Sequence, residues 1–106
     1  MITFEDFKKL DLRIAKILDV KEHPNADRLY VLQIDVGGET KQVVAGIRAS
    51  YTPSDLLGKS VVIINNLEPA TIRGEASNGM VLAASSEGGP IVLVPEKETS
   101  VGAKIS

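Results

Sequence analysis

The most chemically varied side chains of the sequence stand in one polar segment, residues 66–80. This segment follows an apolar run at 61–64 and leads into another at 80–84. It contributes a guanidinium, a hydroxyl, an amide and a thioether, from Arg73, Ser77, Asn78 and Met80. A connection between two buried strands is where a rigid scaffold presents contact groups. We therefore interpret these residues as candidates for binding a ligand by charge, hydrogen bonds and apolar packing.

A second polar segment, residues 21–28, is expected to form a loop. Pro24, Asn25 and Asp27 within it are turn formers. Asn25 fits two interpretations equally, because its amide either bonds the local backbone or faces a ligand. Asp27 is better explained as a residue that shapes the loop, whereas Arg28 adds a positive charge at its end.

Catalysis by this chain alone has little support. There is no cysteine, which excludes thiolate nucleophiles, disulfides and cysteine zinc sites. The single histidine, His23, is interpreted as structural or solvent-facing, and Ser77 has no lysine nearby in sequence to act as its base. The pairs Gly37-Gly38 and Gly88-Gly89 lack the lysine that follows a phosphate-binding loop. We predict no catalytic residue, no metal site and no cofactor.

The composition is that of one globular domain covering residues 1–106. The chain is 43% hydrophobic and 25% charged, and its core should be modest enough to be shared with a second copy. The longest aliphatic run, Val61 to Ile64, is too short to cross a membrane, and no secretory signal pattern is found, so a cytoplasmic location is expected. The net charge of −2 counts against a polyanionic partner unless the cations gather on one side.

Apolar periodicity predicts an all-β domain. We expect a short helix over 3–9 with a capping box between Thr3 and Asp6, and a helical turn over 52–58 with a capping box between Thr52 and Asp55. Strands are expected over 11–20, 29–36, 41–47, 60–67 and 80–85, with a tight turn at residues 37–38 between the second and the third. The strand over 60–67 is expected to be buried on both faces. A short strand over 91–94 and a tail segment over 101–105 form a C-terminal extension. Three strands, a helical turn and two more strands are the order of the five-stranded Greek-key barrel called the OB-fold.

In such a barrel several cations would border one surface. OB barrels bind oligonucleotides across strands two and three, between the loop joining strands one and two and the loop joining strands four and five. Arg28 and Arg73 fall in those loops, and Lys41 begins the third strand. Two interpretations stay open at this point: a nucleic-acid surface, or the ordinary charges of any soluble domain. Phe4, Phe7, Tyr30 and Tyr51 are few for stacking on single strands, which favours a folded RNA.

Five motifs follow one another along the chain: residues 7–14 (FKKLDLRI), 23–29 (HPNADRL), 43–47 (VVAGI), 66–69 (NLEP) and 77–80 (SNGM). Together they closely resemble the small tRNA-binding domain family. That domain is found at the C-terminus of bacterial methionyl-tRNA synthetases, in stand-alone structure-specific tRNA-binding proteins, in the endothelial monocyte-activating polypeptide and in a secretion-related chaperone. The resemblance covers essentially the whole chain, and it implies an OB-fold that binds tRNA by shape.

Carried over position by position, the resemblance implies a set of tRNA contacts. These are Asn25, Arg28, Lys41, Gln42, Arg73, Ser77 and Met80, and Asn78 is a further candidate because it lies between Ser77 and Met80. Arg28 stands where lysine is common in the family, and Asn78 where glutamine or glutamate is common. Free-standing members look like homodimers that meet through the N-terminal helix and the C-terminal segment, which implies dimer contacts at Phe4 and Phe7.

Three functions remain open. The first is a structure-specific tRNA-binding module, as the non-catalytic β subunit or the C-terminal tRNA-binding and dimerisation domain of a methionyl-tRNA synthetase; its partners would be tRNA, a second copy and a synthetase catalytic chain. The second is a secretion-related, protein-binding chaperone of the same fold. The third is a dimerisation module with negligible RNA affinity of its own.

Overall fold

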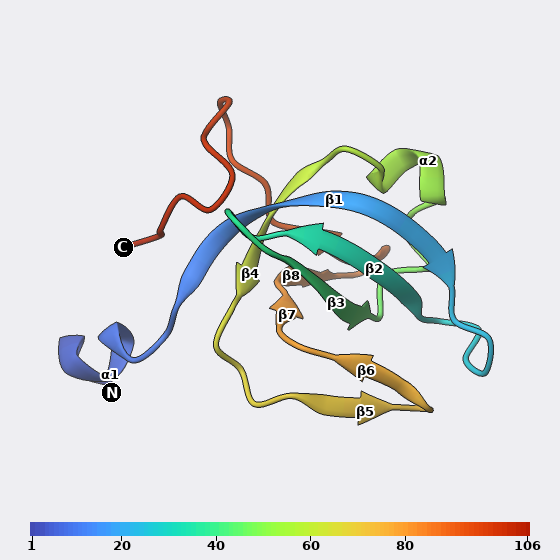
Figure 1. The fold of residues 1–106 in the computed structure, drawn as a ribbon, viewed down its shortest axis with the longest axis horizontal. Coiled ribbons are helices and arrows are strands. Elements are labelled where there is room, and N and C mark those ends of the chain that lie inside the picture. Colours follow the sequence, from blue (N-terminus) through green and yellow to red (C-terminus); the bar gives the residue numbers. More distant parts are fainter.

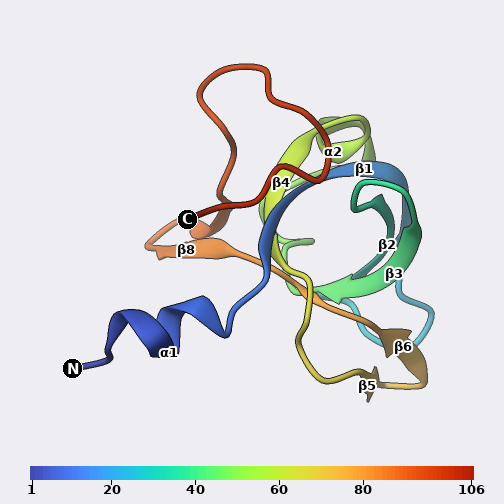
Figure 2. The same cartoon turned by 60° about the vertical axis from the view of Figure 1, so that its left-hand side comes forward.

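The computed structural model describes all 106 residues and shows an antiparallel barrel with several projecting parts (Figure 1). The barrel sheet has the order β3-β2-β1-β4-β7. Its strands are β1 (Leu12–Glu22), β2 (Tyr30–Asp35), β3 (Thr40–Ala45), β4 (Ser60–Ile64) and β7 (Met80–Val81). The outer strands β3 and β7 are in contact, so the sheet curls into the ring seen nearly end-on in Figure 2. The five-stranded all-β barrel expected from the sequence is confirmed, in the strand order of an OB-type barrel.

β1 is the strand around which the barrel closes. Residues Leu12–Lys16 pair with β4, and residues Lys16–Glu22 pair with β2. The register shifts between Ile17 and Asp19, and a bulge of this kind bends a strand and increases its twist. Leu18 lies at this shift, without a partner residue in β2, and its side chain is exposed.

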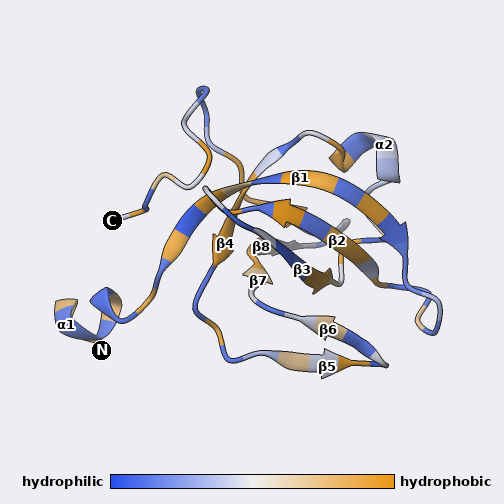
Figure 3. Ribbon diagram, in the orientation of Figure 1, coloured by the Kyte–Doolittle hydropathy of each residue, from blue (hydrophilic) through white to orange (hydrophobic).

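The core fills the ring. Figure 3 shows apolar and polar residues alternating along β1, as expected for a strand with one face inside a barrel. The helix α2 (Pro53–Leu56) contributes Leu56 to this core, and its predicted capping box between Thr52 and Asp55 is present. Thirteen buried residues form the cluster: Ala15, Ile17, Tyr30, Leu32, Ile34, Val36, Val43, Ala45, Ile47, Leu56, Val61, Ile63 and Val92. Each large aliphatic side chain among them contributes about 1.5–3 kcal/mol by its burial.

Two predicted strands are corrected by the structure. β4 stops at Ile64 rather than at 67, and only Val61 and Ile63 are buried, since its other side chains point to the outer, less covered face of the sheet. The strand predicted over 80–85 divides at Leu82, whose N–H bonds to the carbonyl of Val62 and whose carbonyl accepts from Leu93. The chain thus changes partners there, and β8 (Ala83–Ser86) leaves the barrel to pair with β9 (Gly89–Val92).

The polar segment at residues 66–80, which was expected to connect two strands as a loop, contains a hairpin. β5 (Ala70–Ile72) pairs with β6 (Glu75–Ser77) as a separate two-stranded sheet. Figure 1 shows this hairpin below the barrel, with its turn directed toward the loop that follows β1. Contacts between β3 and β6 join the hairpin to the barrel wall.

The two chain ends lie on the side of the barrel away from that loop (Figure 1). The helix α1 (Phe4–Lys8) has the predicted capping box between Thr3 and Asp6, yet none of its residues is buried, and it projects from the barrel in both views. No helix has the length and apolar character needed to span a membrane.

The C-terminal tail lies along the part of β1 that β2 leaves unpaired. The N–H of Ile14 bonds to the carbonyl of Ala103, and the carbonyl of Ile14 accepts from the N–H of Gly102. Gly102 has a positive φ of 87° and passes so close to Gly37 that a Cβ on Gly37 would lie 2.7 Å from the Gly102 Cα. The tail segment predicted over 101–105 is therefore present as an edge-covering strand segment rather than as a full strand.

Candidate nucleic-acid interface

The hairpin β5–β6 ends in a two-residue turn at Arg73 and Gly74. Both residues have positive φ, 53° and 93°, the combination of a type I′ turn whose twist suits a tight hairpin. Glycine adopts this conformation freely, but at a non-glycine residue such as Arg73 it costs about 1–2 kcal/mol. Strain of this kind persists only where surrounding contacts hold it, so the contacts of Arg73 identify what the turn is built against.

Those contacts come from the loop between β1 and β2. Arg73 Nη2 donates to the carbonyl of Asn25 at 3.0 Å, and Asn25 Nδ2 lies 3.4 Å from the carbonyl of Arg73. A surface cavity of about 460 Å³ lies between residues 25–29 and Arg73, and Arg28 is part of its lining. Three predicted contact residues therefore meet at the turn end of the hairpin, and we call Asn25, Arg28 and Arg73 the tip cluster.

The other predicted contact residues meet where the hairpin joins the barrel. Gln42 Nε2 donates to the carbonyl of Ala76 at 2.9 Å, and the N–H of Asn78 donates to the carbonyl of Gln42 at 2.8 Å. Met80 follows at the start of β7, paired with Ile64 and exposed. We call Lys41, Gln42, Ser77, Asn78 and Met80 the base cluster.

Lys41 and Gln42 do not point the same way. Lys41 shares its parity on β3 with the core residues Val43 and Ala45, and its amine reaches the end of β4, where Nζ donates to the carbonyl of Asn65 at 2.8 Å. Gln42 has the opposite parity and lies outside the barrel, under β6. The base cluster therefore bends around the end of β3 instead of lying along one flat wall.

Ser77 is a predicted contact residue with an internal role in this structure. Its side chain is buried, its Oγ accepts the N–H of Val44 at 2.9 Å, and it donates to the carbonyl of Gly79 at 3.3 Å. These bonds tie the end of β6 to β3. The geometry thus gives Ser77 the task of holding the hairpin, while the exposed side chains of Asn78 and Met80 face solvent.

Eight of the twelve Lys and Arg side chains form no ion pair, and the predicted contact cations are among them. Four ion pairs occupy Lys8, Lys9, Arg13 and Arg48. Arg48 pairs with Glu22, lies 5.9 Å from the ring centre of Tyr30 and donates to the carbonyl of Ala26, so it supports the β1–β2 loop from below. Arg28, Lys41 and Arg73 form no ion pair, which leaves their charge available to an anionic partner.

A second polar network lies beside the base cluster. Arg13 Nε donates to both carboxylate oxygens of Asp11, at 2.9 and 3.1 Å, and Asn65 Nδ2 donates to the same carboxylate at 3.0 Å. The bonds from Arg13, followed by that from Asn65, lower the pKa of Asp11. Because Asn65 also accepts from Lys41, this network connects the root of β1 with the cationic end of β3.

Two residues with clear structural tasks were not predicted as part of the site. His23 is buried, as a structural interpretation requires, and its Nε2 lies 2.9 Å from the carbonyl of Ile72 at the hairpin turn. Asn66 accepts the N–H of Asp11 and donates to the carbonyl of Lys9, both at 2.8 Å, and so fixes the joint between α1 and β1. The motifs at 23–29 and 66–69 mark both residues as notable in the sequence. A single sequence does not, however, reveal contacts between residues forty or more positions apart, such as His23 with Ile72.

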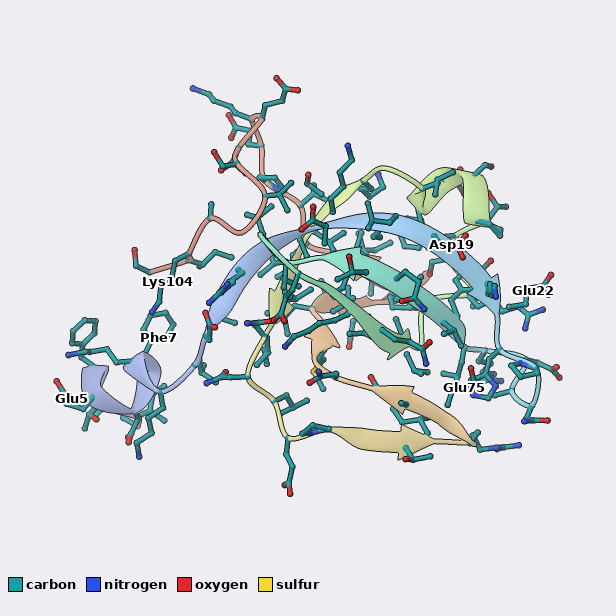
Figure 4. All side chains as sticks on the ribbon, viewed as in Figure 1. Glu5, Phe7, Asp19, Glu22, Glu75 and Lys104 are labelled. Carbon is teal, nitrogen blue, oxygen red and sulfur yellow. The ribbon has the colours of Figure 1, made fainter.

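The predicted dimer residues lie at the opposite end from the tip cluster. Figure 4 labels Glu22 and Glu75 near the tip, and Phe7 near Lys104 of the C-terminal tail at the other end. Phe4 is 70% exposed, whereas Phe7 is half-buried. No group of three or more potential metal-ligating side chains is present.

Sequence comparison connects this chain with proteins of tRNA aminoacylation. The family described as "Putative tRNA binding domain" matches residues 12–104. The methionine–tRNA ligase of Thermococcus onnurineus is 53% identical over 104 residues, and that of Pyrococcus horikoshii is 50% identical over the same length. Each alignment covers 98% of this chain but 14% of the ligase, so the chain spans about a seventh of the length of these curated relatives.

Structural comparison finds the same fold in solved chains of similar length. The crystal structure of the chaperone CsaA from Bacillus anthracis superimposes with a TM-score of 0.90 at 37% identity, covering 100% of this chain and 99% of that one. The CsaA chaperone protein from Picrophilus torridus gives a TM-score of 0.94 at 31% identity, with both chains covered fully.

Proposed function

The chain belongs to the putative tRNA-binding domain family, and from this we propose that it binds folded tRNA through the tip and base clusters. The observation that carries the proposal is the placement of unpaired cations at both ends of one hairpin. Arg28 and Arg73 stand at its turn, and Lys41 stands near its base. At about 3.3 Å per residue, the four residues from Arg73 to Ser77 separate the two clusters by about 13 Å. That span fits a backbone of several nucleotides rather than a single phosphate.

Recognition in this proposal depends on shape and backbone. The exposed groups of the two clusters are cations, amides and one thioether, and no exposed aromatic ring is among them. Amides and cations suit phosphates, riboses and a few unstacked bases of a folded RNA, whereas general single-strand binders depend on rows of aromatic rings.

The role we propose is that of a non-catalytic, cytoplasmic accessory to methionyl-tRNA synthesis. The relatives at about half identity are methionine–tRNA ligases, although the chain covers 14% of their length. A weak second contact with tRNA, on the same polypeptide as a catalytic chain or bound to one, raises the local tRNA concentration at the active site.

We also propose that two copies associate through α1. The helix has five residues, too few to be stable alone, and it buries none of them in this copy. Met1, Ile2 and Phe4 are exposed together at this end of the chain. A second copy that packs against this apolar group would account for a helix that the barrel itself does not cover, and Phe4 and Phe7 are the proposed contacts.

The decisive test is a titration of the full chain with bulk tRNA, duplex RNA and single-stranded RNA at several salt concentrations. We expect tRNA to bind most tightly and its affinity to fall steeply with salt, because phosphate contacts release counterions. Arg73→Ala and Lys41→Ala should each weaken binding and reduce the slope of log affinity against log salt by about 1.

Lys97→Ala is the matched control, because Lys97 is also free of ion pairs and lies in the loop 93–101, on the far side of the barrel from the hairpin in Figures 1 and 2. Its salt slope should equal that of the wild type. An affinity that does not change with salt, or an equal loss for all three variants, would exclude the proposed interface.

The likeness to two CsaA chaperones supports a second candidate function, the binding of unfolded polypeptide. The exposed apolar residues away from the clusters, Leu57, Ile91, Leu93 and Val94, offer such a surface. Competition separates the two functions. If an unfolded polypeptide binds and displaces tRNA, the surfaces overlap; if tRNA binds and the polypeptide does not, the chaperone function is excluded.

A further inference from the structure

The loop between β1 and β2 and the turn of the β5–β6 hairpin are joined by one buried imidazole. His23 is the first residue after β1, and 4% of its surface is exposed. Its own N–H donates to the carbonyl of Leu29, which closes the base of the loop. The side chain therefore starts from a fixed position and lies between two segments that are 49 residues apart in sequence.

Both ring nitrogens of His23 have a partner, and the partners determine the tautomer. Nδ1 lies 3.0 Å from the N–H of Asn25, and because this backbone group is a donor, Nδ1 must accept. Nε2 lies 2.9 Å from the carbonyl of Ile72, which is an acceptor, so Nε2 carries the hydrogen. The neutral imidazole is thus used completely, as an acceptor toward the loop and a donor toward the hairpin.

The two partners are the backbone neighbours of the contact residues. The accepted N–H belongs to Asn25, and the carbonyl that receives the Nε2 hydrogen directly precedes Arg73. The hydrogen bonds between Asn25 and Arg73 lie on the solvent side of the imidazole. They also depend on the distance between the β1–β2 loop and the hairpin turn. Since His23 is absent from the core cluster, this joint is separate from the packing that holds the barrel.

We propose that His23 is the positioning residue of the RNA interface: its imidazole sets the distance between the β1–β2 loop and the hairpin turn. This inference rests on the proposed tRNA binding. Without the bridge, the three-residue strands of the hairpin would fluctuate, and RNA would have to order the tip cluster on binding. The contacts in the complex would be the same, but the cost of ordering the tip cluster would make the binding free energy less favourable.

The test uses three substitutions of the full chain. His23→Ala removes both bonds. His23→Asn keeps an acceptor near the position of Nδ1 but loses reach to Ile72, whereas His23→Gln keeps a donor near the position of Nε2. We expect tRNA affinity to fall about 10-fold for His23→Ala, to fall similarly for His23→Asn, and to recover in part for His23→Gln, the variant that still reaches the hairpin.

Two readouts distinguish positioning from direct contact and from general instability. The salt slope of His23→Ala should stay at the wild-type value, because no charge is removed, in contrast to Arg73→Ala. Amide hydrogen exchange should accelerate at 70–77 while β1–β4 keep their protection. Tyr51→Phe is the matched control: it removes the partly buried hydroxyl that accepts the N–H of Val92 on the β9 side, and should leave tRNA affinity unchanged.

The outcomes separate this inference from the proposed function. Wild-type tRNA binding with unchanged affinity in His23→Ala overturns the inference and leaves the function standing. Lost affinity with unchanged exchange at 70–77 also overturns it, since the hairpin would then not have been loosened. Absence of tRNA binding by the wild type overturns both. If His23→Ala does not fold, the ranking of His23→Gln above His23→Asn at matched melting temperature decides the question.

Discussion

The hairpin β5–β6 and the helix α1 both leave the barrel, but they are held in different ways. The hairpin is polar and fixed at two places: Ser77 bonds to β3 at its base, and His23 bonds to Ile72 at its turn. The helix is fixed at its root by Asn66, none of its residues is buried, and Phe4 faces solvent. The hairpin thus satisfies its hydrogen bonds within one copy, whereas the helix leaves apolar surface uncovered.

This difference indicates which kind of binding partner suits the hairpin and which suits the N-terminal helix. A hairpin held in place by hydrogen bonds, with unpaired cations at both ends, is preorganised for a polar and anionic partner. The exposed apolar residues at the N-terminal end, Met1, Ile2 and Phe4, are suited to a partner with a complementary apolar surface, and in the proposed dimer a second copy supplies one. In the function proposed above, RNA binding and self-association are therefore divided between two ends of one small domain.

The largest effect is expected at the helix. Phe4→Glu places a charge where the proposed dimer is apolar, and should weaken self-association at least about 100-fold, since a buried unpaired charge costs several kcal/mol. Light scattering across concentration measures it. Leu57→Glu is the control, because Leu57 is also exposed, at 58%, but lies next to α2. If the wild-type chain stays monomeric at high concentration, a second copy does not cover α1, and the proposed reason why the helix is less buried than the hairpin is wrong.

A smaller effect is expected at the base of the hairpin. Ser77→Ala leaves the buried N–H of Val44 without an acceptor and should lower the free energy of unfolding by about 1–3 kcal/mol. Denaturant unfolding measures this loss, and Ser85→Ala at an exposed serine of β8 should be neutral. If Ser77→Ala unfolds at the wild-type midpoint, the hairpin is not held from its base as described.

The smallest effect is expected in the network that joins the two regions. Asp11→Asn weakens the bonds from Arg13 and Asn65 and should lower stability by about 1 kcal/mol at pH 7. The folded-state pKa of Asp11 is lowered, so its contribution is present above the ordinary aspartate value and disappears as the pH falls through the folded-state pKa. The stabilities of the variant and the wild type should therefore begin to converge below pH about 4 and become equal only below the folded-state pKa of Asp11. A stability difference that persists at lower pH would show that the charge of Asp11 is not its cause.

The sequence predicted the parts of the molecule that depend on local patterns. Capping boxes at Thr3 and Thr52, the two-glycine turn after β2 and the alternation of β2 and β3 each have a signal within a few residues, and each is present. The proximity of Asn25 and Arg73 could be predicted only from the OB-fold strand order, because that order brings their two loops together.

The failures have physical causes that a local pattern does not carry. Arg73-Gly74 is a weaker hairpin signal than Asn-Gly, so the sequence predicts a loop between two strands here rather than a hairpin. The division at Leu82 depends on which distant strands offer a partner, Val62 on one side and Leu93 on the other. Burial of Ser77 likewise depends on β3, more than thirty residues earlier, and a lone serine after a glycine-rich turn gives no indication of it.

The close approach of Gly37 and Gly102 has a consequence for solubility. The last residues can lie flat on the first half of β1 only because neither glycine carries a side chain there. In that position they occupy amide and carbonyl groups that would otherwise form an open sheet edge, the feature through which β proteins add foreign strands and aggregate. We expect a bulkier residue at either position to lift this cover and to leave that sheet edge open while the barrel stays intact.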